Sequence, residues 1–251
     1  MDSKITIKGL NLFFGKTQVL KGVNLDVYRN RISGFMGPSA SGKSTLISVI
    51  NKLVFFEEAV RTEGSVYIDG QNILGNGLSD VALRKKVGTL FATPIPLPRS
   101  IFENIAFGPK LNGTWKKSDL YAIVEESLTK AFLWDEVKDR LDDSALKLSG
   151  GQQQRLCLAR TLALKPEIIL LDEPCSGLDP ISTLKIEEAL AELKSEHTII
   201  LVSNNTKQIA RACDFVAFLY LGELIEAGTT DKVFTYPDAK MTEDYIQGKF
   251  G

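Results

Sequence analysis

The chain has 251 residues, of which 44% are apolar and 24% are charged. This length and composition are typical of a globular protein with one large α/β domain or two modest ones. The 30 Lys and Arg residues nearly balance the 31 Asp and Glu residues, so the formal net charge is -1. Because a near-neutral chain offers no general attraction to phosphate backbones, we expect no nucleic-acid partner.

No stretch approaches the apolar length that spans a bilayer, and the first residues carry no signal-peptide pattern. We therefore expect the chain to remain in the cytoplasm and to reach a membrane only through a partner. The three cysteines, Cys157, Cys175 and Cys213, are scattered and form no Cys-x-x-Cys pair. This spacing is typical of reduced thiols rather than of a disulfide framework or a zinc site.

The first third of the chain predicts strands, because β-branched residues alternate with polar ones between turn signals such as Asp69-Gly70. The expected strands cover residues 5–12, 23–27, 32–36 and 65–68. The run over 32–36 leads into a glycine-rich loop, and a helix is expected over 43–53.

The middle of the chain has a different character. Alternating prolines between residues 93 and 98 force an extended, unpaired backbone. Helices are then expected over 118–131, with Ser118 as the N-cap, and over 133–141. We interpret residues 91–148 as a helical subdomain that is inserted into an α/β core.

From residue 149 onward, helices alternate with apolar strands. The expected helices cover 150–164 and 181–194, and the expected strands cover 168–171, 198–203, 215–219 and 223–226. Continuous apolar runs such as 168–171 indicate strands that are covered on both faces. The sequence therefore predicts one α/β domain over 1–251, with a mostly parallel core sheet, an N-terminal antiparallel β part and the inserted helices. The core of this domain is expected over about 1–90 and 149–251.

The octapeptide that begins at Gly37 matches the phosphate-binding pattern G-x-x-x-x-G-K-[ST]. Glycines let successive backbone N–H groups curl around phosphates, and the helix that follows presents its positive N-terminus to the same anion. We expect Lys43 to neutralise the β- and γ-phosphates of ATP and the Ser44 hydroxyl to ligate Mg²⁺. A chance match arises in roughly one chain in a hundred, and the flanking strand and helix argue against it. The expected ATP-binding residues here are Gly37, Pro38, Ser39, Ala40, Ser41, Gly42, Lys43, Ser44 and Thr45.

Two acids, Asp172 and Glu173, follow the apolar run over 168–171. Ligands of open α/β sheets bind at this carboxyl end of the strands. We expect Asp172 to hold the Mg²⁺ shell and Glu173 to act as the general base on the attacking water, with Lys43 as the second catalytic group. The alternative is a pair of surface acids at a strand end, which the neighbouring P-loop makes less favourable.

The segment Leu148-Ser149-Gly150-Gly151-Gln152 begins a predicted helix. Ser149 and Gln152 have the spacing of a capping box, in which each side chain bonds the other residue's backbone. An ordinary helix start explains these two residues, but it does not explain two glycines in the first turn, where they weaken the helix. We expect the glycines to allow close approach of an anion.

Together these motifs resemble the ATP-binding cassette (ABC) ATPases over essentially the whole chain. Residues 148–152 are similar to the family's signature, the segment ending at Asp179 to its D-loop, and Phe14 to the aromatic residue that stacks on adenine. The resemblance implies a P-loop NTPase fold of the ABC ATPase type, with a RecA-like core over about 1–90 and 149–251. It also implies that two nucleotide-binding subunits sandwich two ATP molecules. Ser149 and Gly151 would then contact the γ-phosphate of the ATP that the partner holds.

Residues 94–108, 179–183, 220–226 and 242–251 look like the corresponding segments of the ATP-binding subunit of phosphate importers. This resemblance implies a peripheral position on the cytoplasmic face of the membrane. It also implies permease subunits as direct partners, docked near 91–104, and a solute-binding protein as an indirect one. ATP is the implied substrate and Mg²⁺ the implied cofactor.

Two positions depart from the family's pattern. Ala92 stands where a glutamine is expected, and Asn204 stands where a histidine is expected. Alanine has no polar atom, and asparagine can donate a hydrogen bond but cannot carry a charge or relay a proton. We expect this chain to bind Mg-ATP but to hydrolyse it slowly at its own P-loop. His197, interpreted as a surface or strand-start residue, is not expected to substitute.

Two functions therefore stay open. The chain is either a transport ATPase subunit or a regulatory half of a heterodimeric transporter that hydrolyses little ATP, so its dimer partner is either a second copy or a different subunit. A soluble ABC ATPase that acts on DNA or ribosomes would need coiled-coil, zinc or tandem-cassette insertions, for which this chain has no room. Cys175, in a position usually held by threonine, is expected to change little.

Overall fold

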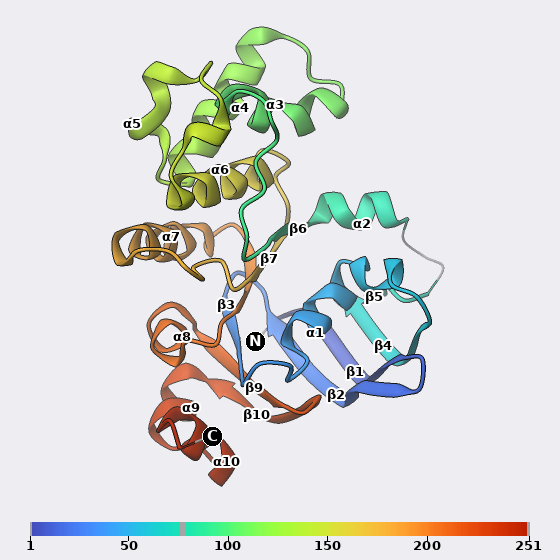
Figure 1. The fold of residues 1–251 in the computed structure, drawn as a ribbon. Coiled ribbons are helices and arrows are strands. Elements are labelled where there is room, and N and C mark those ends of the chain that lie inside the picture. Colours follow the sequence, from blue (N-terminus) through green and yellow to red (C-terminus); the bar gives the residue numbers. More distant parts are fainter. Residues whose placement is uncertain (1, 76–78, 250–251) are drawn as a thin grey trace.

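The computed structural model describes residues 2–75 and 79–249, and its strands form two sheets (Figure 1). The smaller sheet is antiparallel and has the order β2-β1-β4-β5. The larger sheet has the order β10-β9-β3-β8-β7-β6, and all its neighbouring strands are parallel except β10 and β9. The strands are β1 Ser3–Phe14, β2 Thr17–Tyr28, β3 Ile32–Met36, β4 Val60–Ile68, β5 Gln71–Asn72, β6 Val87–Leu90, β7 Ile168–Asp172, β8 Thr198–Val202, β9 Phe215–Tyr220 and β10 Glu223–Thr229. The predicted fold class is confirmed.

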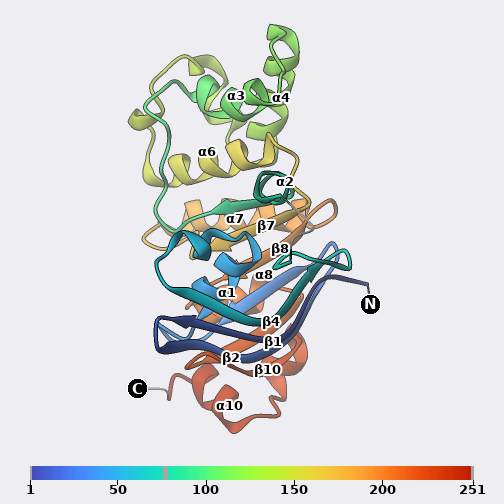
Figure 2. The same cartoon turned by 90° about the vertical axis from the view of Figure 1, so that its right-hand side faces the viewer.

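The helices pack around the larger sheet, with α3, α4 and α6 at one end of the molecule and α10 at the other (Figure 2). The α-helices are α1 Lys43–Ile50, α2 Asp80–Lys86, α3 Ile101–Leu111, α4 Lys117–Lys130, α5 Trp134–Val137, α6 Gly150–Leu162, α7 Pro180–Leu193, α8 Thr206–Ala212, α9 Thr230–Thr235 and α10 Lys240–Ile246. Three 3-10 helices lie at η1 Leu53–Phe56, η2 Lys138–Arg140 and η3 Ala145–Lys147. Helix α6 packs against α3 and α4, so it belongs with the helices of the predicted subdomain. We call α3, α4, α5 and α6 the helical cluster.

Strand β7 shows how both faces of the larger sheet are covered. Ile169 and Leu171 pack with the core residues of the helical cluster, whereas Ile168 and Leu170 pack with residues of the antiparallel sheet and α1. All four side chains are fully buried. The continuous apolar run therefore forms a strand covered on both faces, as expected for a parallel sheet.

Strands β1 and β4 are longer than the segments predicted for them. Gly9, with φ 56°, interrupts the pairing register of β1 with both neighbouring strands. A Cβ atom on Gly64 of β4 would lie 2.4 Å from the Gly9 carbonyl oxygen, so the two backbones approach closely at a bulge. Since a bulge breaks the alternation of buried and exposed residues, the segment predicted for β4 begins only after Gly64, whereas the segment predicted for β1 crosses Gly9 and misses two residues at each end of the strand.

Two expectations in the helical cluster were wrong. Lys116, rather than Ser118, is the N-cap of α4, and the Ser118 hydroxyl bonds to the neighbouring Asp119 carboxylate instead. The helix expected over 133–141 is the short α5 followed by the 3-10 turn η2. Helices of this length are marginal alone, so tertiary contacts decide how such a segment ends.

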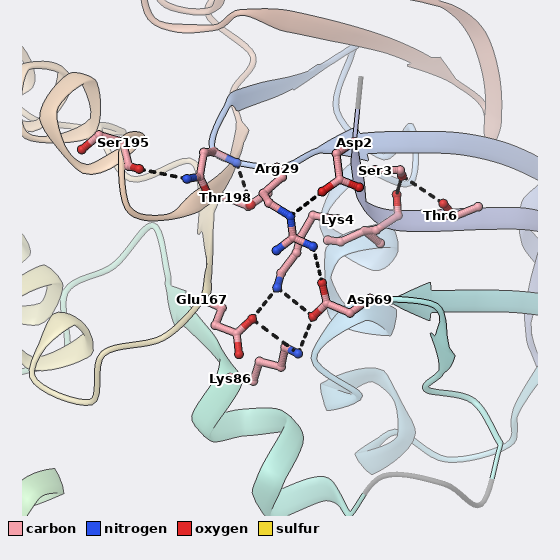
Figure 3. Close-up of polar contacts among 12 residues, drawn as sticks. Asp2, Ser3, Lys4, Thr6, Arg29, Asp69, Lys86, Glu167, Ser195 and Thr198 are labelled. Carbon is pink, nitrogen blue, oxygen red and sulfur yellow. Dashed lines mark hydrogen bonds and ion pairs between the residues drawn. The ribbon is translucent and has the colours of Figure 1, made fainter.

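A network of ion pairs joins the antiparallel sheet to the larger one (Figure 3). Lys4 is 2% exposed and bonds both to Asp69, at 2.8 Å, and to Glu167, which directly precedes β7. Arg29 and Lys86 also bond Asp69. Although burial opposes it, these three cations hold the pKa of Asp69 below its ordinary value.

Candidate functional site

The residues predicted to act on the nucleotide gather where parallel strands end. The P-loop follows β3, Glu173 follows β7, Asn204 lies just after β8, and Ala92 lies just after β6. These four strands are neighbours in one sheet and run in the same direction. Their carboxyl ends therefore form one edge, which is where open α/β sheets bind ligands.

The backbone of the P-loop needs glycine at two positions. Gly37 has φ 148°, and a Cβ atom there would lie 2.1 Å from the Leu219 carbonyl oxygen. Gly42 has φ 98° and is the N-cap of α1, where a Cβ atom would lie 2.9 Å from a Leu20 methyl group. Between them, Ala40 also adopts a left-handed conformation, with φ 60°. The loop is thus shaped by close packing against β9 and β2 as well as by its own turns.

Lys43, the first residue of α1, is folded back into the P-loop. Its Nζ donates to the carbonyl oxygens of Gly37 and Pro38, both at 2.8 Å, and to Ser41 Oγ at 3.3 Å. Burial lowers the pKa of Lys43, and the nearby carboxylates of Glu173 and Asp172 oppose that shift. The ammonium group is therefore surrounded by acceptors in the loop that a phosphate would occupy.

Ser44 and Asp172 meet at the mouth of a groove of about 350 Å³. Ser44 Oγ donates to Asp172 Oδ1 at 2.8 Å, and the groove is also lined by Phe14, Thr45 and Phe91. A hydroxyl and a carboxylate are the oxygen ligands that Mg²⁺ accepts alongside phosphate oxygens and water. The paired residues fit a magnesium ion, and the half-buried Phe14 lies in the same groove.

Glu173 has an unusual backbone. Its φ of 51° lies in the left-handed region, and its N–H donates to the Val202 carbonyl oxygen at 3.0 Å. Burial raises the pKa of its carboxyl group, and the neighbouring Asp172 adds to that effect, while Lys43 and the backbone N–H of Asn204 oppose it. A carboxylate with a raised pKa is a stronger base at neutral pH.

Neither Ala92 nor Asn204 supplies the side chain that is expected at its position. Ala92 is half-buried, and Asn204 is exposed. Asn204 and Glu173 line one open groove of about 740 Å³, together with Cys175 and Glu187. Burial raises the pKa of the Cys175 thiol to about 11, so the thiol is neutral. His197 does not substitute, because it is buried with Nδ1 bonded to the Pro166 carbonyl oxygen. Of the two positions expected for it, the strand start is confirmed, since it directly precedes β8, and the surface position is wrong.

The signature segment begins α6 with the predicted capping box. The Gln152 N–H donates to Ser149 Oγ at 3.3 Å, and the Ser149 N–H donates to Gln152 Oε1 at 3.1 Å. The structure adds a steric reason for Gly151, because a Cβ atom there would lie 2.1 Å from Ser182 Oγ of α7. At Gly150 the nearest such atom, in Leu178, is 3.9 Å away.

Other contacts of the signature segment stay within the helical cluster and α7. Leu148 is buried, and its carbonyl oxygen accepts from Gln153. Asp179 of the expected D-loop is the N-cap of α7 and accepts from the Ser182 N–H at 2.9 Å and the Ser182 hydroxyl at 2.6 Å. Within the described ranges, no hydrogen bond or ion pair joins residues 148–152 to the P-loop. One chain therefore does not bring the two motifs together.

Two residues that sequence reasoning missed hold the signature helix. Glu136 of α5 accepts hydrogen bonds from Arg155, Lys185 and Gln152. Burial opposes ionisation, but these donors hold the pKa of Glu136 at about 2. Gln154 is fully buried on the inner face of α6. Its place one helical turn before Leu158, among apolar positions, was a signal that a polar side chain points inward.

The fold and this edge define a P-loop nucleotide-binding protein. A family model described as ABC transporter matches residues 20–176, which is more than half of the chain, and the chain belongs to this family. It is an ATPase subunit of the kind that powers transporters, and members of the family bind ATP and use Mg²⁺.

Solved structures agree with this fold. The chain is similar to CbiO1 from Clostridium perfringens, described as part of the ABC transporter complex CbiONQ, with a TM-score of 0.83 and 24% identity over 99% of this chain and 97% of that one. It is also similar to a bacterial Atm1-family ABC exporter with ATP bound, with a TM-score of 0.81 and 26% identity over 98% of this chain and 42% of that one. None of the helices in the described part of the chain has the length and apolar character of a membrane span.

Proposed function

We propose that this chain is the ATP-binding and ATP-hydrolysing subunit of an importer for inorganic phosphate, on the cytoplasmic face of the membrane. The observation that carries the ATPase role is the meeting of Lys43, Ser44, Asp172 and Glu173 at one edge of the sheet. Phosphate as the solute rests on the likeness of residues 94–108 and 242–251 to subunits of phosphate importers. In this proposal the ATP-hydrolysing subunit lies outside the permeation path, so it need not contact the transported phosphate.

In this proposal each side chain has one task. Lys43 neutralises the β- and γ-phosphates, and Phe14 stacks on adenine. Ser44 and Asp172 would hold Mg²⁺, which would supply positive charge beside the phosphates. Water attacks the γ-phosphorus and passes a proton to Glu173, and the bond to the β–γ bridging oxygen breaks to release ADP and phosphate. Residues 148–152 serve the ATP of a second nucleotide-binding subunit.

A second candidate is the regulatory half of a heterodimer, which Ala92 and Asn204 favour. In such a pair this chain's own P-loop mainly holds ATP, while its complete signature segment completes the partner's site. Permease subunits and a solute-binding protein belong to both candidates.

Uptake of labelled phosphate in the source cells tests the solute. Cells that lack this chain should lose uptake, and they should regain it with the parent chain but not with Lys43→Ala. Purified chain should in parallel bind Mg-ATP and release phosphate slowly, and Glu173→Gln should stop that release without weakening binding. Normal phosphate uptake without the chain would overturn the choice of solute, and failure to bind ATP would overturn the ATPase role.

A further inference from the structure

Gln154 is a buried polar side chain that the proposed mechanism leaves without a task. It lies on α6 and is 0% exposed. Its Nε2 donates to the carbonyl oxygen of Phe91 at 2.8 Å and to that of Pro174 at 2.9 Å. Because both neighbours can only accept, the amide nitrogen must face them. One side chain thus joins α6 to the residue before Ala92 and to the residue after Glu173.

The oxygen of this amide, in contrast to its nitrogen, lowers the stability of the fold. Gln154 Oε1 is buried and has no hydrogen-bond partner among the residues that the structure describes. A buried acceptor without a partner destabilises a protein, whereas an apolar side chain of the same size would fill the space without that loss. A residue that served packing alone would therefore be better replaced by methionine or leucine. The two donated bonds are the feature that needs a glutamine.

The turn that Gln154 holds is strained. Glu173 has φ 51°, which is unfavourable for a residue with a side chain, and such conformations persist only where several contacts enforce them. Three contacts do so here. The Glu173 N–H bonds the Val202 carbonyl oxygen, the Glu173 carbonyl oxygen accepts from the Ser176 N–H, and the next carbonyl, of Pro174, accepts from Gln154. The first two contacts join backbone groups, and the third is made by the side chain of Gln154. This side chain comes from α6, the helix that the signature segment begins.

We infer that Gln154 is a positioning residue for Glu173. By holding the Pro174 carbonyl, it fixes the left-handed turn that aims the Glu173 carboxylate. By holding the Phe91 carbonyl as well, it makes that turn depend on where α6 and the segment at Ala92 lie. The inference rests on the proposed function, because it assumes that Glu173 takes the proton of the attacking water.

The test compares two neighbouring glutamines in the full chain. Gln154→Met removes both donated bonds and nearly keeps the volume. Gln153→Met is the matched control, since Gln153 Nε2 also donates to two carbonyl oxygens, those of Leu146 and Leu148, but not to the turn after β7. Mg-ATP hydrolysis is measured under steady-state and single-turnover conditions, in the parent background and in the double reversion Ala92→Gln/Asn204→His.

Gln154→Met should lower kcat by about 10- to 100-fold and leave KM within about twofold, because a misplaced base slows the chemical step while the P-loop still binds ATP. Gln153→Met should change kcat less than about twofold. A kcat for Gln154→Met equal to that of Gln153→Met overturns the inference.

Two further variants separate loss of the positioning role from misfolding and from a wrong assignment of Glu173. Gln154→Asn retains a buried amide but is one methylene shorter, so it should lower kcat in the same direction even if Gln154→Met fails to fold, and an unchanged kcat in Gln154→Asn overturns the inference. Glu173→Gln separates the two levels. If it stops hydrolysis while the Gln154 variants do not, only the positioning role is wrong. If Glu173→Gln hydrolyses ATP normally, Glu173 is not the base and the positioning role falls with it, whereas the ATPase role itself fails only if the parent chain does not bind Mg-ATP.

Discussion

The two ends of the proposed site are built in different ways. At the P-loop end, Lys43 and Ser44 begin α1 and Asp172 ends β7, and these residues are already within bonding reach of each other or of the loop. At the signature end, Ser149 and Gln152 start a helix of the helical cluster and bond each other and Glu136. The first end is made by the core sheet, and the second is made by helix packing.

The ends also differ in completeness. The signature segment keeps every residue of the family's pattern, while the P-loop end has Ala92 and Asn204 in place of the expected glutamine and histidine. The P-loop itself is intact, so we expect the two departures to affect hydrolysis rather than binding. In terms of the proposal, the chain is better equipped to complete a partner's site than to turn over its own ATP.

The largest effect should come from breaking the P-loop end. Lys43→Ala removes the ammonium group that is proposed to neutralise the phosphates, and charge-assisted bonds of this kind contribute about 1.5–3 kcal/mol each. ATP affinity should fall about 100-fold in an equilibrium titration with a fluorescent ATP analogue. Lys232→Ala, at a surface lysine of α9, is the control and should bind like the parent. Unchanged affinity in Lys43→Ala would place the nucleotide elsewhere.

The next effect should come from placing the residues that the family's pattern expects at positions 92 and 204. Ala92→Gln with Asn204→His should raise kcat for Mg-ATP about 100-fold, because one preorganised polar group at a reaction centre commonly changes rates by about 10²–10³. ATP affinity should stay within about threefold. The single reversions need not add up, since both act on one reaction centre. A parent chain that is already as fast as the double reversion contradicts the idea of a weakened own site.

The sequence predicted the architecture well where its patterns were continuous. The buried run of β7 and the turn chemistry of the P-loop follow directly from local rules, so the fold class was within reach, whereas the order of the strands was not predicted. Two elements near the site were not predicted. Strand β6 has only 4 residues, too few to show a pattern. Helix α3 contains Gly108 and Pro109 near its end, and both residues are unfavourable in helices. The roles of Glu136 and Gln154 were also out of reach, because their partners lie far away in the chain.

The signature end offers a steric test of smaller size. A Cβ atom on Gly151 would meet both Oγ and Cβ of Ser182, at 2.1 and 2.6 Å, and overpacking of this kind costs about 1–3 kcal/mol. Gly151→Ala should therefore lower the free energy of unfolding by about 2 kcal/mol in urea denaturation. Gly150→Ala has open space and should be neutral or stabilise the helix by up to about 1 kcal/mol. Equal effects at the two glycines would mean that Ser182 moves aside, and Ser182→Gly should relieve the penalty of Gly151→Ala.

The smallest effect concerns the clamp on the signature helix. Glu136 has a pKa of about 2 in the folded chain, against an ordinary value of 4.5. A carboxyl group whose pKa is lowered by folding stabilises the protein above its unfolded pKa, and this stabilisation is lost as the pH falls through the folded pKa. Glu136→Gln should therefore be about 1–2 kcal/mol less stable than the parent at pH 7, and the difference should shrink between pH 4.5 and pH 2. Asp135→Asn is the matched control, because the adjacent Asp135 is 88% exposed and pairs with Lys138. A pH-independent difference for Glu136→Gln would show that packing, rather than charge, holds α5 against α6.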